Sequence, residues 1–393
     1  MKDNWQIKKL GEVSKIIMGQ SPPSDTYNEN AKGMPFFQGK AEFTELYPVV
    51  KKYCTKPTKI AEPLDILLSV RAPVGTTNIA NQQCCIGRGL AAIRFENYKY
   101  GFYFLRSIQH ELDSKGTGTT FRAISGETIR ETLIPFPNPE IQQAIVSKIE
   151  ELFSELDKGI EDLKTAQQQL KTYRQSVLKW AFEGKLTNEN VKDGELPEGW
   201  KMVKVSEIAK IETGTTPSKN NPDFYGNEFP FYKPTDLEAG NNVFKSKDGL
   251  TELGVKQARY VPEFSTLVTC IGATIGKTGF IKTGGGFNQQ INAIVPNDAV
   301  NPLFVYYQTI GLSFQKQIID NSSATTLPII NKSKFQILRM VLCNLNEQHQ
   351  IVQEIESRLS VADKMEESIA QSLQQAEALR QSILKKAFSG ELI

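Results

Sequence analysis

The amino-acid sequence repeats itself at an offset near 200 residues. The segment WQIKKLGEV at residues 5–13 returns as WKMVKVSEI at residues 200–208. Later matches drift in offset from 195 to 206, and from residue 141 onward the offset stays at 206. There, RQSVLKWAFEGKLT at 174–187 and RQSILKKAFSGELI at 380–393 share nine of 14 positions. A long internal repeat indicates two copies of one structural unit, and the contrast predicts two diverged modules, each followed by a conserved segment.

The conserved segments have the sequence pattern of long helices. In the first copy, one series of apolar residues recurs every seven positions, at Ile149, Leu156, Leu163, Leu170 and Val177. A second series beside it, at Ile145, Leu152, Ala166, Tyr173 and Trp180, has the same spacing but is interrupted by Gly159. The second copy has Ile355, Ala362, Ile369, Ala376 and Ile383 beside Ile351, Met365 and Leu379. Such series mark a coiled-coil seam, and each segment ends before a glycine, Gly184 or Gly390, as a helix end prefers.

Each predicted helix needs a packing partner, because a polar helix of this length is not stable alone. About 44 residues at ~1.5 Å per residue extend roughly 65 Å. Equal lengths and matched heptads favour a mutual antiparallel pair. The alternative is that each helix packs on its own module.

The two modules are predicted to be mainly β. Runs such as LDILLSVRAPVG and STLVTCIGATIGKTGFI are short and are interrupted by glycine, proline and small polar residues, as strands and turns are. Short helices are expected at 98–114 and 302–317. The predicted fold class is α+β, with two repeated mainly-β domains separated by two long antiparallel coiled-coil helices and related by a pseudo-two-fold. The predicted domains are module 1 at 1–139, a long helix at 140–183, a linker at 184–197, module 2 at 198–345 and a second long helix at 346–393.

Composition favours a globular protein of the cytoplasm. The chain is 39% apolar and 23% charged, and no window reaches the ~18 uninterrupted apolar residues of a membrane span. The N-terminus lacks the apolar core of a secretory signal, and five irregularly spaced cysteines argue against a disulfide framework. The net charge of +2 is uneven, because residues 1–139 hold 18 Lys/Arg against 13 Asp/Glu and residues 198–345 hold 15 against 12. A basic excess in both modules suits a phosphate backbone.

No motif provides a credible active site, so no catalytic residue is predicted. The segment Gly272–Thr278 resembles a phosphate-binding loop but has three residues between its glycines, where that loop needs four. The segment NPDF at 221–224 resembles the motif of amino-methyltransferases but has Asp223 in place of the second proline. The two histidines, His110 and His349, have no His or Cys at ligand spacing, so no metal site is expected.

Basic side chains interleaved with aromatic and small polar residues in predicted loops suggest a nucleic-acid surface on each module. Arg and Lys pair with guanine edges, Gln and Asn pair with adenine, and hydroxyl groups bind phosphates. The candidate DNA contacts of module 1 are Lys40, Arg71, Arg88, Lys115, Thr119, Thr120 and Arg122. Those of module 2 are Lys219, Lys233, Lys277, Gln289, Gln290, Thr325 and Thr326. The repeat aligns residues 70–75 with 271–276 and so sets Arg71 against Gly272, which warns against carrying a contact from one module to the other.

The repeat, the paired helices and the twin R-Q-S-(V/I)-L-K-x-A-F-x-G-x-L segments together give a resemblance to a known family. The chain resembles the specificity subunit of type I restriction-modification enzymes over essentially its whole length. The resemblance implies that each module is a target-recognition domain that reads one half of a bipartite double-stranded DNA sequence. It also implies that the helices fix the spacer between the halves.

The same resemblance implies that the catalytic residues lie on other chains. Two methyltransferase subunits would dock on the helices and methylate adenine N6 with S-adenosylmethionine, and two restriction subunits would use ATP and Mg²⁺. The chain itself is expected to bind no cofactor. The residues expected in the coiled coil and in partner docking are Leu156, Leu163, Leu170, Val177, Leu178, Phe182, Ile369, Ile383, Leu384 and Phe388.

Two other functions compete with DNA recognition. The first is a coiled-coil adaptor whose modules bind protein, and the second is a phosphate-binding enzyme built around Gly272–Thr278. Salt-sensitive binding to duplex DNA separates DNA recognition from the adaptor. Nucleotide binding that is lost in Lys277→Ala would support the enzyme.

Overall fold

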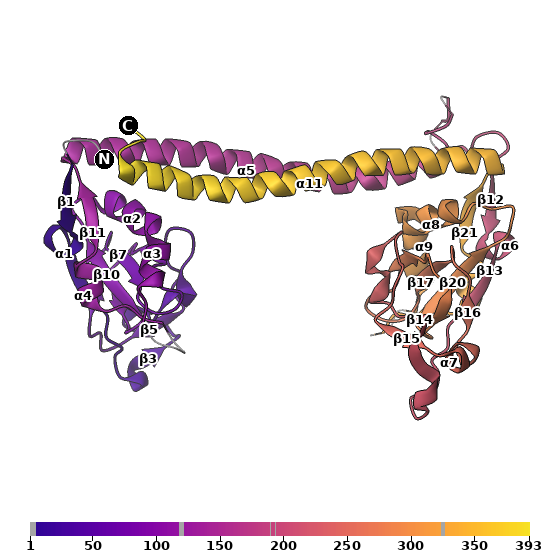
Figure 1. Ribbon diagram of the computed structural model, residues 1–393, viewed down its shortest axis with the longest axis horizontal. Coiled ribbons are helices and arrows are strands. Elements are labelled where there is room, and N and C mark those ends of the chain that lie inside the picture. The colour runs from indigo at the N-terminus through magenta and orange to yellow at the C-terminus, as the bar shows by residue number, and fades with distance from the viewer. Residues whose placement is uncertain (1–4, 118–121, 189, 193, 324–326) are drawn as a thin grey trace. The chain divides into compact units, whose positions relative to one another are not determined.

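The structure is a computed structural model that describes residues 5–117, 122–188, 190–192, 194–323 and 327–393 (Figure 1). Its contacts divide the chain into two compact units. Unit 1 comprises Met1–Lys164 and Ala370–Ile393, and unit 2 comprises Thr165–Ile369. Each unit holds one β-rich module and one part of each long helix, so the division falls within the helices.

Module 1 is built from three small sheets with short helices beside them. Its elements are β1 Gln6–Lys9, α1 Leu10–Val13, β2 Lys15–Met18, η1 Ser24–Thr26, β3 Tyr27–Asn28, β4 Met34–Phe37, η2 Lys40–Glu42, β5 Lys52–Cys54, β6 Ile60–Ala61, β7 Ile66–Ser69, β8 Thr77–Ile79, β9 Cys84–Ile86, β10 Leu90–Arg94, α2 Tyr98–Ser107, α3 Gln109–Ser114, α4 Gly126–Arg130 and β11 Leu133–Phe136. An antiparallel sheet has the order β2-β10-β7-β8, a mixed sheet has the order β3-β5-β4-β9-β6, and β1 pairs with β11. The helix expected at 98–114 is divided into α2 and α3.

Module 2 repeats this topology. Its elements are β12 Lys201–Lys204, α6 Val205–Ile208, β13 Ala209–Thr213, η3 Pro222–Phe224, β14 Tyr225–Tyr232, η4 Asp236–Ala239, β15 Asp248–Leu250, α7 Glu252–Gln257, β16 Tyr260–Val261, β17 Thr266–Thr269, β18 Thr278–Phe280, β19 Gly285–Phe287, β20 Ile291–Pro296, α8 Pro302–Ile310, α9 Leu312–Asn321, α10 Lys332–Phe335 and β21 Arg339–Leu342. Its sheets have the orders β13-β20-β17-β18 and β15-β14-β19-β16, and β12 pairs with β21. The central strands β7 and β17 are buried on both faces, which explains why their sequences are continuous apolar or Thr-rich runs.

Two long helices complete the units. They are α5 (Pro139–Phe182) and α11 (Leu345–Ser389). The side-chain oxygens of Asn138 and Asn344 accept hydrogen bonds from amides of the first turns at 2.9 and 3.0 Å, and such caps satisfy donors that the helix leaves unpaired. The glycines that follow the two helices have positive φ angles of 80° (Gly184) and 82° (Gly390). The predicted α+β fold with two long helices is confirmed.

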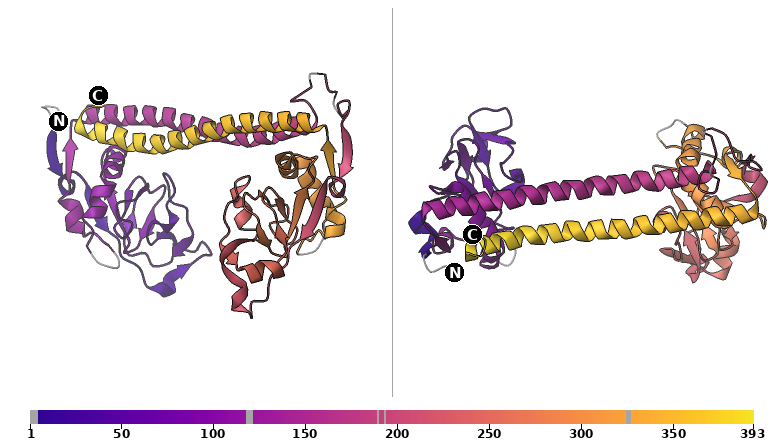
Figure 2. Two further views of the ribbon diagram at one scale, coloured as in Figure 1. Left: turned by 45° about the vertical axis from the view of Figure 1, so that its right-hand side comes forward. Right: turned by 90° about the horizontal axis from the view of Figure 1, so that it is seen from above.

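Within each unit the two helix segments lie side by side and run antiparallel (Figure 2). In unit 2, Arg174 of α5 binds Asp363 of α11 at 2.7 Å. In unit 1, Arg380 of α11 forms an ion pair with Asp157 of α5. The two arginines are equivalent at the repeat offset of 206, and so are the two aspartates. One interhelical ion pair therefore occurs twice, as the internal repeat predicts.

The helices also pack on the modules, so the two arrangements weighed from the sequence coexist. In unit 1, the first turns of α5 and the last turns of α11 share a core with Tyr100 and Phe104 of α2. In unit 2, the last turns of α5 and the first turns of α11 share a core with Trp200 and Phe304. The end of α5 thus packs on module 2, which follows it in the chain, and not on module 1.

Part of the second predicted apolar series lies outside the seam, although Ile145 and Ile351 of that series are buried. The series Ile355, Ala362, Ile369, Ala376 and Ile383 is buried throughout. By contrast, Met365, Leu379 and Trp180 are 52%, 49% and 41% exposed, so their assignment to the interface was wrong. Two helices cover only a narrow stripe of each other, and with 3.6 residues per turn the flanking positions rotate towards solvent.

Candidate nucleic-acid interface

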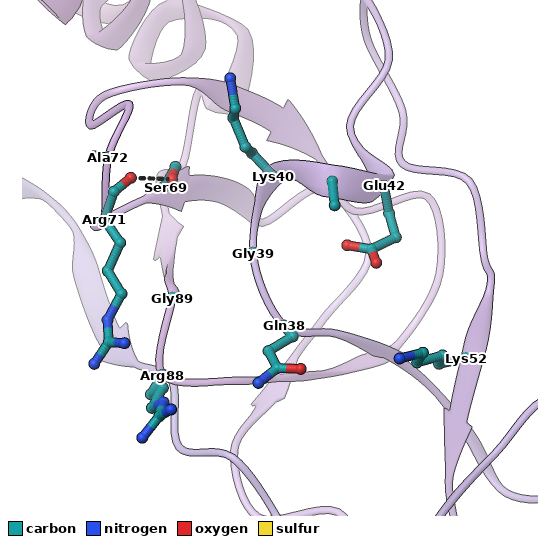
Figure 3. Close-up of a pocket in the computed structure, with 11 residues that line it drawn as sticks. Gln38, Gly39, Lys40, Glu42, Lys52, Ser69, Arg71, Ala72, Arg88 and Gly89 are labelled. Atoms are coloured by element: carbon teal, nitrogen blue, oxygen red, sulfur yellow. Dashed lines mark hydrogen bonds between the residues drawn. The ribbon is translucent and has the colours of Figure 1, made fainter. Parts of the chain in front are cut away.

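A cleft opens on module 1 where two parallel strands end. β4 and β9 pair in parallel, with Phe36 opposite Cys85 and Phe37 opposite Ile86. Because the carboxyl ends of parallel strands lie at the same edge of a sheet, the segments that follow β4 and β9 meet there. The cleft has a volume of about 470 Å³ (Figure 3) and is lined by Gln38, Gly39, Lys40, Ala41, Glu42, Lys52, Ser69, Arg71, Ala72, Arg88 and Gly89.

Arg88 lies in the tight turn between β9 and β10. The Gly87 amide donates to the Phe37 carbonyl oxygen at 2.8 Å, and the Gly89 amide donates to the Gln38 carbonyl oxygen at 3.2 Å. A Cβ atom on Gly89 would lie only 2.4 Å from that Gln38 oxygen. The close approach of the two chains therefore requires glycine beside Arg88, and the turn holds the exposed Arg88 side chain at the cleft.

A second set of backbone bonds fixes Arg71. Arg71 forms a β-bridge with Ala123, and the Ala72 amide donates to the Arg122 carbonyl oxygen at 3.0 Å. The Ser69 hydroxyl donates to the Arg71 carbonyl oxygen at 2.9 Å, which is the dashed line in Figure 3. These contacts use the main chain of Arg71 and leave its exposed guanidinium group for the cleft.

Four cationic side chains line this cleft: Lys40, Lys52, Arg71 and Arg88. Among the residues that the structure describes, no carboxylate lies within ion-pair distance of any of them. The acidic side chain in the lining is Glu42, whose buried Oε2 atom accepts no hydrogen bond from the described chain. Unpaired cations in a concave wall attract an anion such as a phosphate group, and the planar fork of an arginine fits the guanine edge.

Lys52 is a cleft residue that is absent from the sequence-based candidates. It reaches the cleft because strand register places it opposite Phe36, and pairing between β4 and β5 cannot be read from local composition. The available signal is the basic doublet Lys51-Lys52. Exposed lysines are common on protein surfaces, so that signal alone is weak.

The remaining candidates of module 1 do not line the cleft or fall outside the described residues. Lys115 pairs with Glu111 one helical turn earlier at 2.6 Å. Arg122 lies 3.7 Å from Asp113. The candidates outside the described residues are Thr119 and Thr120.

The structure corrects the alignment of the two modules at Arg71. The bridge between Arg71 and Ala123 is repeated in module 2 as a bridge between Ile271 and Ile329. Arg71 therefore corresponds to Ile271 and not to Gly272, as the repeat in the sequence suggested. The next turn is closed by a backbone hydrogen bond, from the Gly75 amide to the Ser69 carbonyl oxygen at 2.9 Å in module 1 and from the Gly276 amide to the Thr269 carbonyl oxygen at 2.8 Å in module 2. The turn of module 2 is one residue longer. The insertion falls after the bridge, a position that residue similarity alone did not reveal.

Gln289 occupies in module 2 the place of Arg88 in module 1. The Asn288 amide donates to the Tyr232 carbonyl oxygen at 3.1 Å and so repeats the first hydrogen bond of the Arg88 turn. The Thr216 hydroxyl donates to Oε1 of Gln289. That bond fixes the orientation of the exposed amide group, whose –NH₂ group then points away from the hydroxyl.

Two cations of module 2 are paired with carboxylates. Strand register places Asp248 at the position that Lys52 has in module 1. The Lys233 ammonium binds Asp248 at 2.6 Å, and the Lys277 ammonium binds Glu238 at 2.6 Å. Lys233, which follows β14, is therefore paired, whereas the four cations of the module 1 cleft have no carboxylate partner among the described residues.

The last candidates of module 2 vary in their surroundings. Lys219 is exposed in the loop before η3. Oε1 of Gln290 accepts a hydrogen bond from the Asn288 side chain at 2.9 Å. The candidates outside the described residues are Thr325 and Thr326.

The helix residues expected in the coiled coil or in partner docking are buried or half-buried inside the units. The half-buried ones are Leu156, Leu163, Leu170 and Phe182. The buried ones are Val177, Leu178, Ile369, Ile383, Leu384 and Phe388. Phe388 packs edge-on against Tyr100 and Phe104 at 5.2 and 5.3 Å between ring centroids, so packing within the chain accounts for its burial.

The described residues offer no site for metal or thiol chemistry. Among them, no group of three or more His, Cys, Asp and Glu is placed to hold a metal ion. All five cysteines are buried and unbridged, and burial raises the pKa of Cys84, Cys270 and Cys343 to about 12. The Thr278 hydroxyl donates to the Gly276 carbonyl oxygen at 2.9 Å, so this loop bonds to itself as a turn does. In the part of the chain that the structure describes, no helix is both long and apolar enough to cross a membrane.

Comparison with known proteins gives one consistent family. The model of the type I restriction modification DNA specificity domain matches residues 2–165 and 197–375. A putative type I restriction enzyme MjaX specificity subunit of Methanocaldococcus jannaschii is 39% identical over 190 residues, which span 47% of this chain and 44% of that protein. The EcoBI specificity subunit of Escherichia coli is 23% identical over 99% of this chain and 86% of its own length.

Two solved structures share the fold. One, from work titled as the structural basis of complex assembly and conformational transition of the type I R-M system, has a TM-score of 0.76 at 21% identity and covers 100% of this chain and 99% of its own. The HsdS subunit from Thermoanaerobacter tengcongensis has a TM-score of 0.65 at 20% identity and covers 100% and 98%. At these identities the likeness supports the two-module architecture and no residue-level role.

Proposed function

The chain belongs to the type I restriction-modification DNA specificity family, and we propose that it is the non-catalytic subunit that reads the DNA target of such a system. Each module reads one half of a bipartite duplex sequence. The observation that carries this proposal is the cleft of module 1, which is lined by Lys40, Lys52, Arg71 and Arg88 without a carboxylate partner for any of them among the described residues. Duplicate modules with different side chains at equivalent places suit a target with two different halves.

The long helices serve as the scaffold in this proposal. The lengths of α5 and α11, 44 and 45 residues, correspond to roughly 65 Å at ~1.5 Å per residue, and this length sets the spacer between the half-sites. The duplicated interhelical ion pairs, Arg174–Asp363 and Arg380–Asp157, support equivalent surfaces that recruit two copies of one partner.

The partners in this proposal supply the chemistry. Two methyltransferase subunits dock on the scaffold and transfer a methyl group from S-adenosylmethionine to adenine N6. Two restriction subunits use ATP and Mg²⁺ to complete the endonuclease. The assembly works in the cytoplasm, where its DNA substrate is found, and five unbridged cysteines suit that reducing compartment.

The alternative of an adaptor with protein-binding modules is not favoured. Its modules would need an exposed apolar patch or another recognisable docking surface, whereas the cleft of module 1 is basic. The phosphate-binding enzyme is disfavoured as well, because Lys277 pairs with Glu238 and Thr278 bonds within its own turn.

Selection from a random duplex library tests the proposal. The full-length chain is assembled with the methyltransferase subunit of its system, and the bound duplexes are sequenced. We expect a bipartite motif with a fixed spacer, and affinity that falls steeply with salt as phosphate contacts release counterions. Equal binding to all duplex sequences would overturn the proposal, and binding that ignores salt would point to the adaptor.

A further inference from the structure

We propose that Arg88 and Gln289 are equivalent specificity-determining residues that read different bases. Arg88 recognises guanine in the half-site of module 1, and Gln289 recognises adenine in the half-site of module 2. The inference rests on the proposed function, because it assumes that both modules present the same edge to the major groove of duplex DNA. It goes further by assigning one base to one side chain in each half.

The equivalence comes from the backbone. Both residues lie in the turn after the strand that is parallel to β4 or β14. In both turns the first amide donates a hydrogen bond to the last carbonyl of the parallel partner strand, β4 or β14, at 2.8 Å in module 1 and 3.1 Å in module 2. Both side chains are exposed. A duplex that docks in the same way on the two modules therefore presents the same base-pair position to Arg88 and to Gln289.

The surroundings of Arg88 match a G·C pair. The guanidinium group has no carboxylate partner in the described chain, and two of its N–H groups fit the O6 and N7 acceptors of guanine. Figure 3 shows Arg88 and Arg71 in the wall of one cleft, with Glu42 elsewhere in its lining. The exposed guanidinium of Arg88 therefore suits a base that offers two acceptors side by side.

The surroundings of Gln289 match an A·T pair instead. A glutamine amide donates to adenine N7 and accepts from its N6 amino group. The Thr216 hydroxyl donates to Oε1 of Gln289, which orients the amide and leaves its second lone pair and its –NH₂ group for the base. Ile271 stands at the place of Arg71, so the second guanidinium group of the module 1 cleft has no counterpart at that position.

Reciprocal exchange of the two residues tests the proposal. The wild type, Arg88→Gln and Gln289→Arg are each assembled as the full chain with the methyltransferase subunit and selected on a duplex library that is randomised in both half-sites. We expect Arg88→Gln to change the preference at one position of one half-site from G·C to A·T by about tenfold or more. Gln289→Arg should produce the reverse change in the other half-site. The half-site that belongs to the unchanged module should keep its motif in each case.

Two further variants separate base reading from charge. Arg88→Lys keeps the charge and donors to guanine, so it should keep the G·C preference in weaker form. Lys56→Gln removes one exposed charge outside the cleft and should change no base preference. If Arg88→Gln lowers binding to all sequences by one factor, Arg88 is a phosphate contact and the proposal is overturned. If the wild type itself shows no motif, the proposed function fails before this inference is tested, so the two failures are distinguishable.

Discussion

The cleft of module 1 and the equivalent edge of module 2 have the same backbone arrangement and different chemistry. In module 1 the turn after β9 carries Arg88, and the pairing of β5 with β4 places Lys52 in the cleft. In module 2 the same turn carries Gln289, and Asp248 stands in the place of Lys52 and binds Lys233. The turn depends on main-chain hydrogen bonds, which most residue types can make. Recognition side chains can therefore be exchanged without a change of fold, and the two halves of a target can diverge independently.

The long helices have the opposite constraint. The ion pair of Arg174 with Asp363 recurs as Arg380 with Asp157. Each arginine binds a carboxylate on the other helix. A substitution of one partner therefore loses the ion pair unless the residue on the other helix changes with it. The helix ends also fill the cores of both modules. This double role explains why the sequence of the helix ends is repeated at nine of 14 positions while the modules drift.

The largest expected effect tests whether the two helix ends are equally important for their modules. Phe388 is 7% exposed and contacts two aromatic rings of α2, whereas Phe182 is half-buried and contacts Phe304 at 5.5 Å. We expect Phe388→Ala to lower the free energy of unfolding of unit 1 by about 3 kcal/mol and Phe182→Ala to lower that of unit 2 by about 2 kcal/mol. Hydrogen exchange read separately at the amides of each module measures both losses.

A matched control for these variants is Trp180→Ala. Trp180 lies on the same helical end and is 41% exposed, so its truncation should change the unfolding free energy by less than about 1 kcal/mol. A larger loss of unfolding free energy for Phe182→Ala than for Phe388→Ala would contradict the expectation that the packing of Phe388 contributes more to unit 1 than the packing of Phe182 contributes to unit 2.

Much of this architecture was predictable from the sequence because it depends on repetition and periodicity. Heptads define the seam at Ile369 and Ile383, and a glycine follows the end of each helix. The flanking series failed at Met365 and Leu379, because seven-residue spacing does not say how wide a stripe one partner helix covers. Sequence alone also could not show that the end of α5 packs on module 2, since that contact depends on tertiary structure.

The second prediction concerns the difference in ion pairing between the cleft of module 1 and the equivalent edge of module 2. Asp248→Ala removes the carboxylate that binds Lys233 and makes module 2 more like module 1. The freed ammonium group should raise the affinity for duplex DNA by about fivefold at low salt and steepen the slope of log affinity against log salt by about one. A salt titration of DNA binding by the full chain with its methyltransferase subunit measures both quantities.

The control for this variant is Asp320→Ala. Asp320 pairs with Lys316 along α9 at 3.0 Å, on an exposed face of module 2 that is not part of this edge. The Asp320→Ala substitution removes the same charge from the chain as Asp248→Ala, and it should leave the slope of log affinity against log salt unchanged. Equal changes in both variants would mean that net charge, and not the position of Lys233, governs DNA binding.

The candidate site was only partly predictable for a reason that these residues illustrate. Arg71 and Arg88 were candidates because they are arginines in predicted loops, and they do meet in one cleft. Lys52 was missed, and Arg71 was aligned with the wrong partner, because both depend on pairing between strands and not on local pattern. The pairing of Lys277 with Glu238 likewise joins residues far apart in the sequence.

The smallest expected effect tests the symmetry of the scaffold itself. Arg174 and Arg380 are 25% and 16% exposed in their side chains, and each binds the equivalent aspartate of the other helix. Partly exposed ion pairs contribute about 0.5 kcal/mol each, so Arg174→Ala and Arg380→Ala should lower the unfolding free energy of units 2 and 1 by similar, small amounts. Each arginine has a second carboxylate, because Arg174 binds Glu366 at 2.9 Å and Arg380 lies 3.7 Å from Glu45. Arg380 also lies over the Phe153 ring at 5.1 Å, which adds a cation–π contact. Hydrogen exchange at the helix amides on either side of each arginine measures the two losses. A loss confined to one unit would mean that only one of the duplicated ion pairs stabilises the scaffold, and the helices would then differ between the units as the recognition edges of the modules do.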